Sequence, residues 1–95
     1  MHAAALCVEL HIPGARSLKD KRAAIKPIVE GSRRRFGVAA AEVGKQDRRQ
    51  AAELAFAAVS STAGHVEEVL ASVERFVWSF PEVEVLSCER HWWGV

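Results

Sequence analysis

The chain has 95 residues and a mass of 10.4 kDa, enough for one domain with a single modest core. Hydrophobic residues make up 49% of it, which excludes a disordered chain, and a formal net charge of +1 indicates no class of partner. Sixteen alanines and twelve valines, against four phenylalanines and no tyrosine, predict a core of small side chains. No apolar run approaches the roughly 20 residues that a membrane helix needs. No signal peptide is recognisable, so we expect a cytoplasmic protein without a membrane partner.

Four segments have the pattern of β-strands. Residues 3–12 alternate between apolar and polar side chains, which is typical of a half-buried strand. Residues 38–44 and 50–61 are predicted to form two strands joined by the polar loop 45–49. Residues 82–92 alternate more loosely and are the predicted last strand.

Two segments have the periodicity of amphipathic helices. The first is expected to begin after Ser17, because Asp20 follows three residues later as in a capping box, and to end at Gly37. Pro27 lies inside this helix and should kink it or divide it in two. The second helix is predicted over 64–80, where one narrow face is apolar.

The resulting order, βαββαβ, predicts a single α+β domain over residues 1–95 with a ferredoxin-like arrangement. In it, two helices cover one face of a four-stranded antiparallel sheet. Right-handed crossovers then give the strand order 4-1-3-2. Cys7 and Cys88 would lie on adjacent strands, as reduced thiols that could be near one another on the open face.

Three chemistries known in ferredoxin-like domains are not supported. An acylphosphatase needs an Asn to hold the attacking water, and the chain contains no Asn, although Arg16 lies in the appropriate loop. A heavy-metal chaperone needs a CxxC motif where this chain has Pro13 to Arg16. An RNA-recognition motif stacks bases on aromatic residues of the open face. The open-face positions expected here are Cys7, Glu9, His11, Glu53, Ala55 and Ala57.

Four polar side chains could converge on that open face: Glu9, His11, Glu42 and Glu53. An acid and histidine group suggests metal binding or acid-base chemistry. A solvated sheet face is the interpretation we favour, because no metal-ligand spacing accompanies these residues. We therefore predict no metal, no cofactor and no catalytic residue, and an enzymatic activity is not expected.

Charge is distributed unevenly along the chain. Residues 1–50 contain 11 Lys/Arg and 5 Asp/Glu, whereas residues 51–95 contain 2 and 7, so the halves carry net charges of +6 and −5. The predicted topology gathers the start of the first helix and the 45–49 loop at one end of the sheet, where helix N–H groups also favour an anion. The basic residues expected there are Arg16, Lys19, Lys21, Arg22, Lys45, Arg48 and Arg49. A solvated charged face that pairs with the acidic half is the alternative interpretation.

Three tryptophans are candidates for an interface. Trp78 lies opposite the apolar stripe of its helix, and one of Trp92 and Trp93 must leave the core side of the last strand. The second and fourth strands would be sheet edges that are open to pairing with another chain. A homodimer formed through an edge strand is therefore plausible, and a tryptophan lid over the small core is the other interpretation.

The chain resembles the YlxP-like proteins, a family of small bacterial proteins described as domain of unknown function 503. Residues 17–22 match the family's S-L-K-x-K-R helix opening, residues 41–47 match its A-E-V-G-x-Q-D hairpin, and residues 60–70 match its entry to the second helix. The chain differs from the family pattern beside Gln50 and in the tail 91–95. The resemblance implies the ferredoxin-like fold but no reaction. The family's genes commonly lie among those for translation initiation and ribosome maturation, which implies a ribosome- or RNA-associated role.

These observations lead us to expect a non-catalytic protein that binds RNA phosphates or a ribosomal particle through its basic end. Gln46, Asp47 and Gln50 could orient the loop or touch bases. The alternative is a protein–protein or regulatory module that forms an edge-strand homodimer and has no nucleic-acid role.

Overall fold

The computed structural model describes residues 1–94 and contains the six expected elements in the expected order. Each observed element overlaps the segment predicted for it, with ends that differ by a few residues. The elements are β1 (His2–His11), α1 (Leu18–Phe36), β2 (Ala39–Gly44), β3 (Ala51–Ser60), α2 (Ala63–Trp78) and β4 (Glu84–Gly94).

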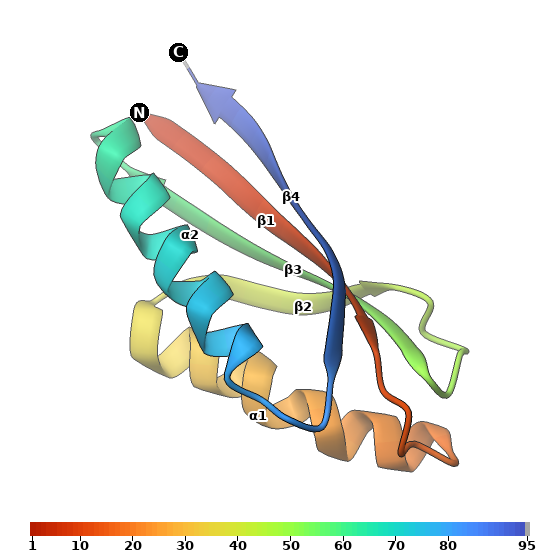
Figure 1. The fold of residues 1–95 in the computed structure, drawn as a ribbon. Coiled ribbons are helices and arrows are strands. Elements are labelled where there is room, and N and C mark those ends of the chain that lie inside the picture. The colour runs from red at the N-terminus through yellow and green to blue at the C-terminus, as the bar shows by residue number, and fades with distance from the viewer. Residues whose placement is uncertain (95) are drawn as a thin grey trace.

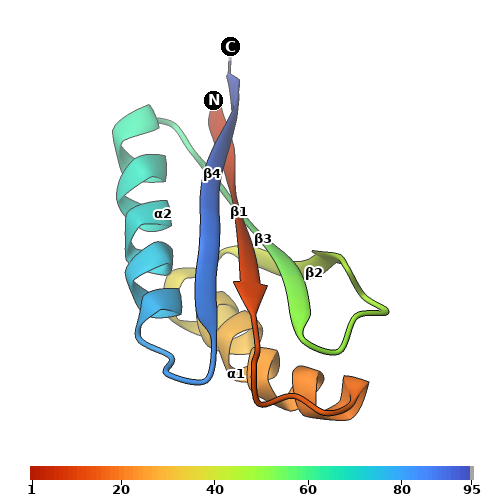
Figure 2. The same cartoon turned by 45° about the vertical axis from the view of Figure 1, so that its right-hand side comes forward.

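The four strands form one antiparallel sheet in the order β2-β3-β1-β4. This is the predicted order 4-1-3-2 counted from the other edge, so the ferredoxin-like α+β fold is confirmed. Figures 1 and 2 show both helices on the same side of the sheet, with the other face uncovered. Within residues 1–94, neither helix has the length and apolarity to cross a membrane.

The core lies between the sheet and the helices. It forms because apolar and polar side chains alternate along the central strands β1 and β3. Leu6 and Val8 of β1 and Leu54 and Phe56 of β3 are fully buried, because successive strand residues point to opposite faces. The helices close this layer with α1 and α2 side chains at helical spacing, namely Ile25, Ile28, Val66, Leu70, Val73 and Val77.

Helix α1 is positioned by its two caps. The Ser17 hydroxyl accepts a hydrogen bond from the backbone N–H of Asp20 at 3.0 Å, as the capping pattern predicts. Gly37 ends the helix in the left-handed region at φ 66°. The helix continues through Pro27 and is not divided there. Since Pro27 and Ala23 are both exposed, water can bond the carbonyl that the proline ring leaves without a donor.

The two cysteines lie on adjacent strands as expected but on opposite faces of the sheet, so the expectation that both lie on the open face is wrong. Cys88 pairs with Val8, whose side chain faces the core, whereas Cys7 pairs with Glu89 and points to the open face. A register shift between Glu9 and Leu10 fixes this arrangement of β4 against β1. Burial raises the pKa of both thiols, and the nearby carboxylates of Glu53 and Glu89 raise the pKa of Cys7 further.

Candidate functional site

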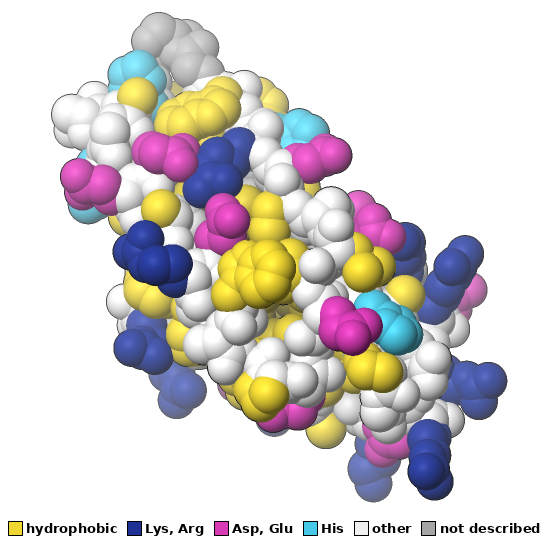
Figure 3. Space-filling model, viewed as in Figure 1, with side chains coloured by type: hydrophobic (Ala, Val, Ile, Leu, Met, Phe, Trp, Pro, Cys, Tyr) yellow, Lys and Arg dark blue, Asp and Glu magenta, His cyan; other side chains and the backbone are white. Residues whose placement is uncertain are grey.

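Two loops meet at one end of the sheet and form a pocket of about 700 Å³. One is the 12–17 loop between β1 and α1, and the other is the 45–50 loop between β2 and β3. Lys and Arg side chains gather over this end of the molecule (Figure 3). We call the cavity the arginine pocket, after Arg16, Arg48 and Arg49 in its lining. The other lining residues are His11, Ala15, Asp47, Gln50 and Ala51.

Gln50 ties the two loops together. Its side-chain amide donates hydrogen bonds to the backbone carbonyls of Pro13 at 3.2 Å and Ala15 at 3.1 Å. The guanidinium of Arg49 also reaches the carbonyl of Arg16 at 3.5 Å. These hydrogen bonds join the 45–50 loop to the 12–17 loop. The backbone segments that carry the three arginines are therefore fixed relative to one another.

Removing the side-chain amide of Gln50 should loosen this connection. We expect Gln50→Ala to lower the free energy of unfolding by about 1 kcal/mol, the usual net value of a lost hydrogen bond at an accessible site. Urea denaturation followed by circular dichroism measures this change. Gln46→Ala is the control, because its amide bonds the carbonyl of Glu42 within the same hairpin and joins no second loop. An equal effect of both substitutions would contradict the connecting role of Gln50.

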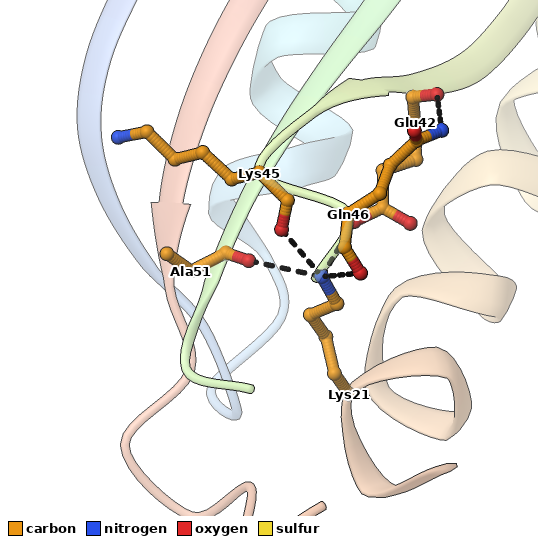
Figure 4. Close-up of polar contacts among 5 residues, drawn as sticks. All are labelled: Lys21, Glu42, Lys45, Gln46 and Ala51. Carbon is orange, nitrogen blue, oxygen red and sulfur yellow. Dashed lines mark hydrogen bonds and ion pairs between the residues drawn. The ribbon is translucent and has the colours of Figure 1, made fainter. Parts of the chain in front are cut away.

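Lys21 lies beneath the 45–50 loop and is only 1% exposed. Its ammonium donates to the carbonyls of Lys45 at 2.9 Å, Ala51 at 3.2 Å and Gln46 at 3.3 Å, and it lies 2.7 Å from the carboxylate of Glu42 (Figure 4). The expectation that Lys21 adds charge to the surface is therefore wrong. A buried ammonium needs this many acceptors, and here it fixes the path of the hairpin loop.

The backbone after β2 is shaped to supply those acceptors. Lys45 adopts a left-handed conformation at φ 57°, and its side chain forms an ion pair with Glu9 on the open face. A register shift lies between Glu42 and Gly44. A β-carbon on Gly44 would lie 2.2 Å from a carboxylate oxygen of Glu53, so only glycine fits there without movement. The side chain of Lys45 therefore pairs with Glu9, while its backbone carbonyl accepts a hydrogen bond from Lys21.

The other predicted basic residues are exposed but not all are brought together. Arg16, Arg48 and Arg49 share the arginine pocket, whereas Lys19 and Arg22 project from α1 outside its lining. The helix N-terminus already holds a carboxylate of its own, because Asp20 accepts a hydrogen bond from the backbone N–H of Arg16 at 3.0 Å. Side-chain guanidiniums are therefore the main cationic groups that the pocket offers.

Of the four residues expected to converge on the open face, Glu9 and Glu53 lie opposite one another there as register partners, whereas Glu42 does not reach that face. Glu42 pairs with Leu54 on the helix-covered side and contacts Lys21. His11 is two residues from Glu9 on the same side of β1, where its Nδ1 lies 2.6 Å from the carboxylate of Glu84 and its ring lines the arginine pocket. Residue-by-residue reasoning missed Glu84, although the pairing of first and last strands could have indicated it.

The tryptophans are exposed, as predicted, but they form two separate sites. Trp92 and Trp93 are 45% and 60% exposed and point to opposite faces near the end of β4. Trp78 is 61% exposed and is the last residue of α2, whose C-terminal end lies away from the C-terminal end of β4 (Figure 1). The end of α2 and the end of β4 therefore offer two separate candidate surfaces.

Two comparisons with known proteins relate the chain to the same family. The sequence model of the family described as "Protein of unknown function (DUF503)" matches residues 3–90. The chain is also 39% identical to the "Uncharacterized protein YlxP" of Bacillus subtilis (strain 168), over 84 residues that cover 88% of this chain and 91% of the relative. The match includes both segments that form the arginine pocket and nearly the entire sheet. We conclude that this chain belongs to the DUF503 family of proteins of unknown function.

Proposed function

We propose that this protein binds RNA, free or in a ribosomal particle, through phosphate contacts at the arginine pocket, and that it does so without catalysing a reaction. The observation that carries the proposal is the convergence of Arg16, Arg48 and Arg49 from two loops on one cavity. Three guanidiniums at one pocket attract an anion, and among the lining residues only Asp47 supplies a carboxylate.

The chemistry of the lining suits an oxyanion such as phosphate. A guanidinium presents a planar set of donors that matches two phosphate oxygens, and it stays charged at all physiological pH values. The 45–50 loop is held by Lys21 and the 12–17 loop by Gln50, so the backbone that carries the three arginines needs little reorganisation on binding. Contacts of this kind position a nucleic-acid backbone without reading its sequence.

A second candidate function is an edge-strand homodimer without a nucleic-acid role. It is favoured by the exposure of Trp92 and Trp93 on β4, which is an edge of the sheet. Apolar edge pairing and phosphate binding differ in their response to salt, since only the second releases counterions.

The test is the binding of a fluorescently labelled RNA hairpin with a single-stranded loop, measured by anisotropy over a series of salt concentrations. Three phosphate contacts predict a slope of about −2 in a plot of log K against log salt, since each single-strand contact contributes about −0.7. Absence of binding at low salt, or a slope of zero, would contradict the proposal. Self-association that is insensitive to salt would instead support the edge-strand homodimer.

A further inference from the structure

Among the lining residues of the arginine pocket, His11 alone belongs to a type that changes charge near neutral pH. The residue ends β1, between its register partners Ala51 on β3 and Glu84 on β4. Its side chain points to the open face, as that of Glu9 does two residues earlier. Because 39% of this side chain is exposed, the imidazole is accessible to a ligand in the cavity.

Glu84 determines which nitrogen of His11 is available to a ligand. The Nδ1 atom lies 2.6 Å from a carboxylate oxygen of Glu84, and an ionised carboxylate only accepts hydrogen bonds. Nδ1 therefore carries a proton at this contact, and Nε2 is the nitrogen that remains for a ligand. Nε2 accepts a hydrogen bond when the ring is neutral and becomes a cationic donor when the ring is protonated. An anion in the pocket therefore binds best to the protonated form of His11.

The groups of the pocket match a phosphate monoester better than an internal phosphodiester of RNA. A phosphodiester has two non-bridging oxygens and a single negative charge, whereas a monoester has three terminal oxygens and a charge of about −2. Three guanidiniums converge on the cavity from two loops, and protonated His11 is a fourth cationic group. With the carboxylates of Asp47 and Glu84, these four cations leave a formal charge of +2. This charge is equal and opposite to that of a terminal phosphate.

We propose that the arginine pocket binds the terminal phosphate of an RNA chain and that His11 is a proton-dependent contact of that phosphate. This inference rests on the proposed function and specifies which group of the RNA enters the cavity. The 12–17 loop, the 45–50 loop and the end of β1 bound the cavity on several sides. A terminal phosphate needs one exit for the nucleotide chain, whereas an internal phosphate needs two.

Fluorescence anisotropy with one RNA hairpin, labelled at a loop base and prepared with a 5′-phosphate, a 3′-phosphate or two hydroxyl ends, tests the terminal site. We expect at least one phosphorylated form to bind about tenfold more tightly than the hydroxyl form at pH 6.5, and the two arms identify which end is bound. Arg48→Gln should abolish this preference, whereas Lys26→Gln, which removes an exposed charge outside the pocket, should keep it. Equal, measurable affinity for all three hairpins would overturn the terminal site and leave the proposed function intact. Absence of binding by all three would contradict the proposed function as well.

The pH dependence of this affinity tests the contact with His11. Histidine takes up its proton near about pH 6.5, whereas carboxylates, lysine and arginine ordinarily keep their charge between about pH 6 and 8. The charged groups on the strands and loops around His11 are all of these constant types: Glu84 on β4, Glu9 on β1, Glu53 on β3, Arg16 in the 12–17 loop, and Lys45, Asp47, Arg48 and Arg49 after β2.

Affinity for the preferred phosphorylated hairpin should therefore rise about threefold or more from pH 8 to pH 6.5, because binding takes up a proton. Below about pH 6 it should fall again, since the monoester then loses its second charge. His11→Gln should remove the rise and keep the fall. His65→Gln, at an exposed histidine of α2 outside the pocket, should change neither. A rise that persists unchanged in His11→Gln protein would overturn the contact with His11.

Discussion

Replacing Lys21 by methionine should lower the free energy of unfolding by about 3 kcal/mol, a large part of the stability of a domain of this size. Methionine keeps the volume of the side chain but removes the ammonium. Glu42 then becomes a largely covered carboxylate without its cation, and the carbonyls of Lys45, Gln46 and Ala51 lose their shared donor. The value lies at the low end for a broken buried pair because 18% of the Glu42 side chain remains exposed. Urea denaturation monitored by circular dichroism measures it.

Two further variants separate this effect from a general loss of positive charge. Lys19→Met removes an exposed cation two residues away and should change stability by no more than about 0.5 kcal/mol. Combining Lys21→Met with Glu42→Leu should recover part of the loss, because no uncompensated charge remains. Equal destabilisation by Lys19→Met and Lys21→Met would show that the buried contacts of Lys21 do not stabilise the fold.

Reversing the charge of Arg16, Arg48 and Arg49 to glutamate should weaken RNA binding by about 100-fold or more. Each lost guanidinium removes a charge-assisted contact worth about 1.5–3 kcal/mol, and each glutamate adds repulsion from the phosphates. The salt dependence should disappear together with the affinity, because counterion release requires the contacts themselves. Anisotropy of the labelled hairpin at several salt concentrations measures both quantities.

A matched variant tests whether position or net charge is responsible. Lys26, Arg34 and Arg75 are exposed and lie outside the arginine pocket, so their reversal to glutamate changes the net charge by the same amount. We expect it to reduce affinity only slightly, through the long-range field of the protein. If the two triple variants weakened binding equally, RNA would be attracted by overall charge and the pocket would not be its site.

Much of the fold could be predicted from the chain because its strands and helices are periodic. The strict alternation of residues 3–12 identified the central strand, and the caps at Ser17 and Gly37 bounded the first helix. Chirality of the crossovers then allowed few topologies. The face of Cys88 could not be predicted in the same way, because one register shift beside Glu9 changes which side chains of β4 face the core.

The candidate site was predictable in location but not in the role of each cation. Charge alone placed Lys21 at the surface, although its spacing from Leu18, Ile25 and Ile28 puts it on the buried stripe of α1. That spacing was the available signal. Backbone carbonyls compensate the buried ammonium for its lost hydration, and their positions depend on the left-handed backbone of Lys45. Backbone geometry of this kind arises from tertiary contacts and leaves little trace in residue types.

The contact between Lys21 and Glu42 has a consequence for the evolution of the family. The two residues belong to different motifs, one at the opening of α1 and the other in β2, yet neither is tolerable in this environment without the other. Substitutions at these positions should therefore be correlated among relatives, with a lineage that loses the lysine also losing the glutamate. Relatives would then keep or lose Lys21 and Glu42 together, because the pair holds the loop between β2 and β3. Arg16, Arg48 and Arg49 would instead be kept or lost with the partner that each relative binds.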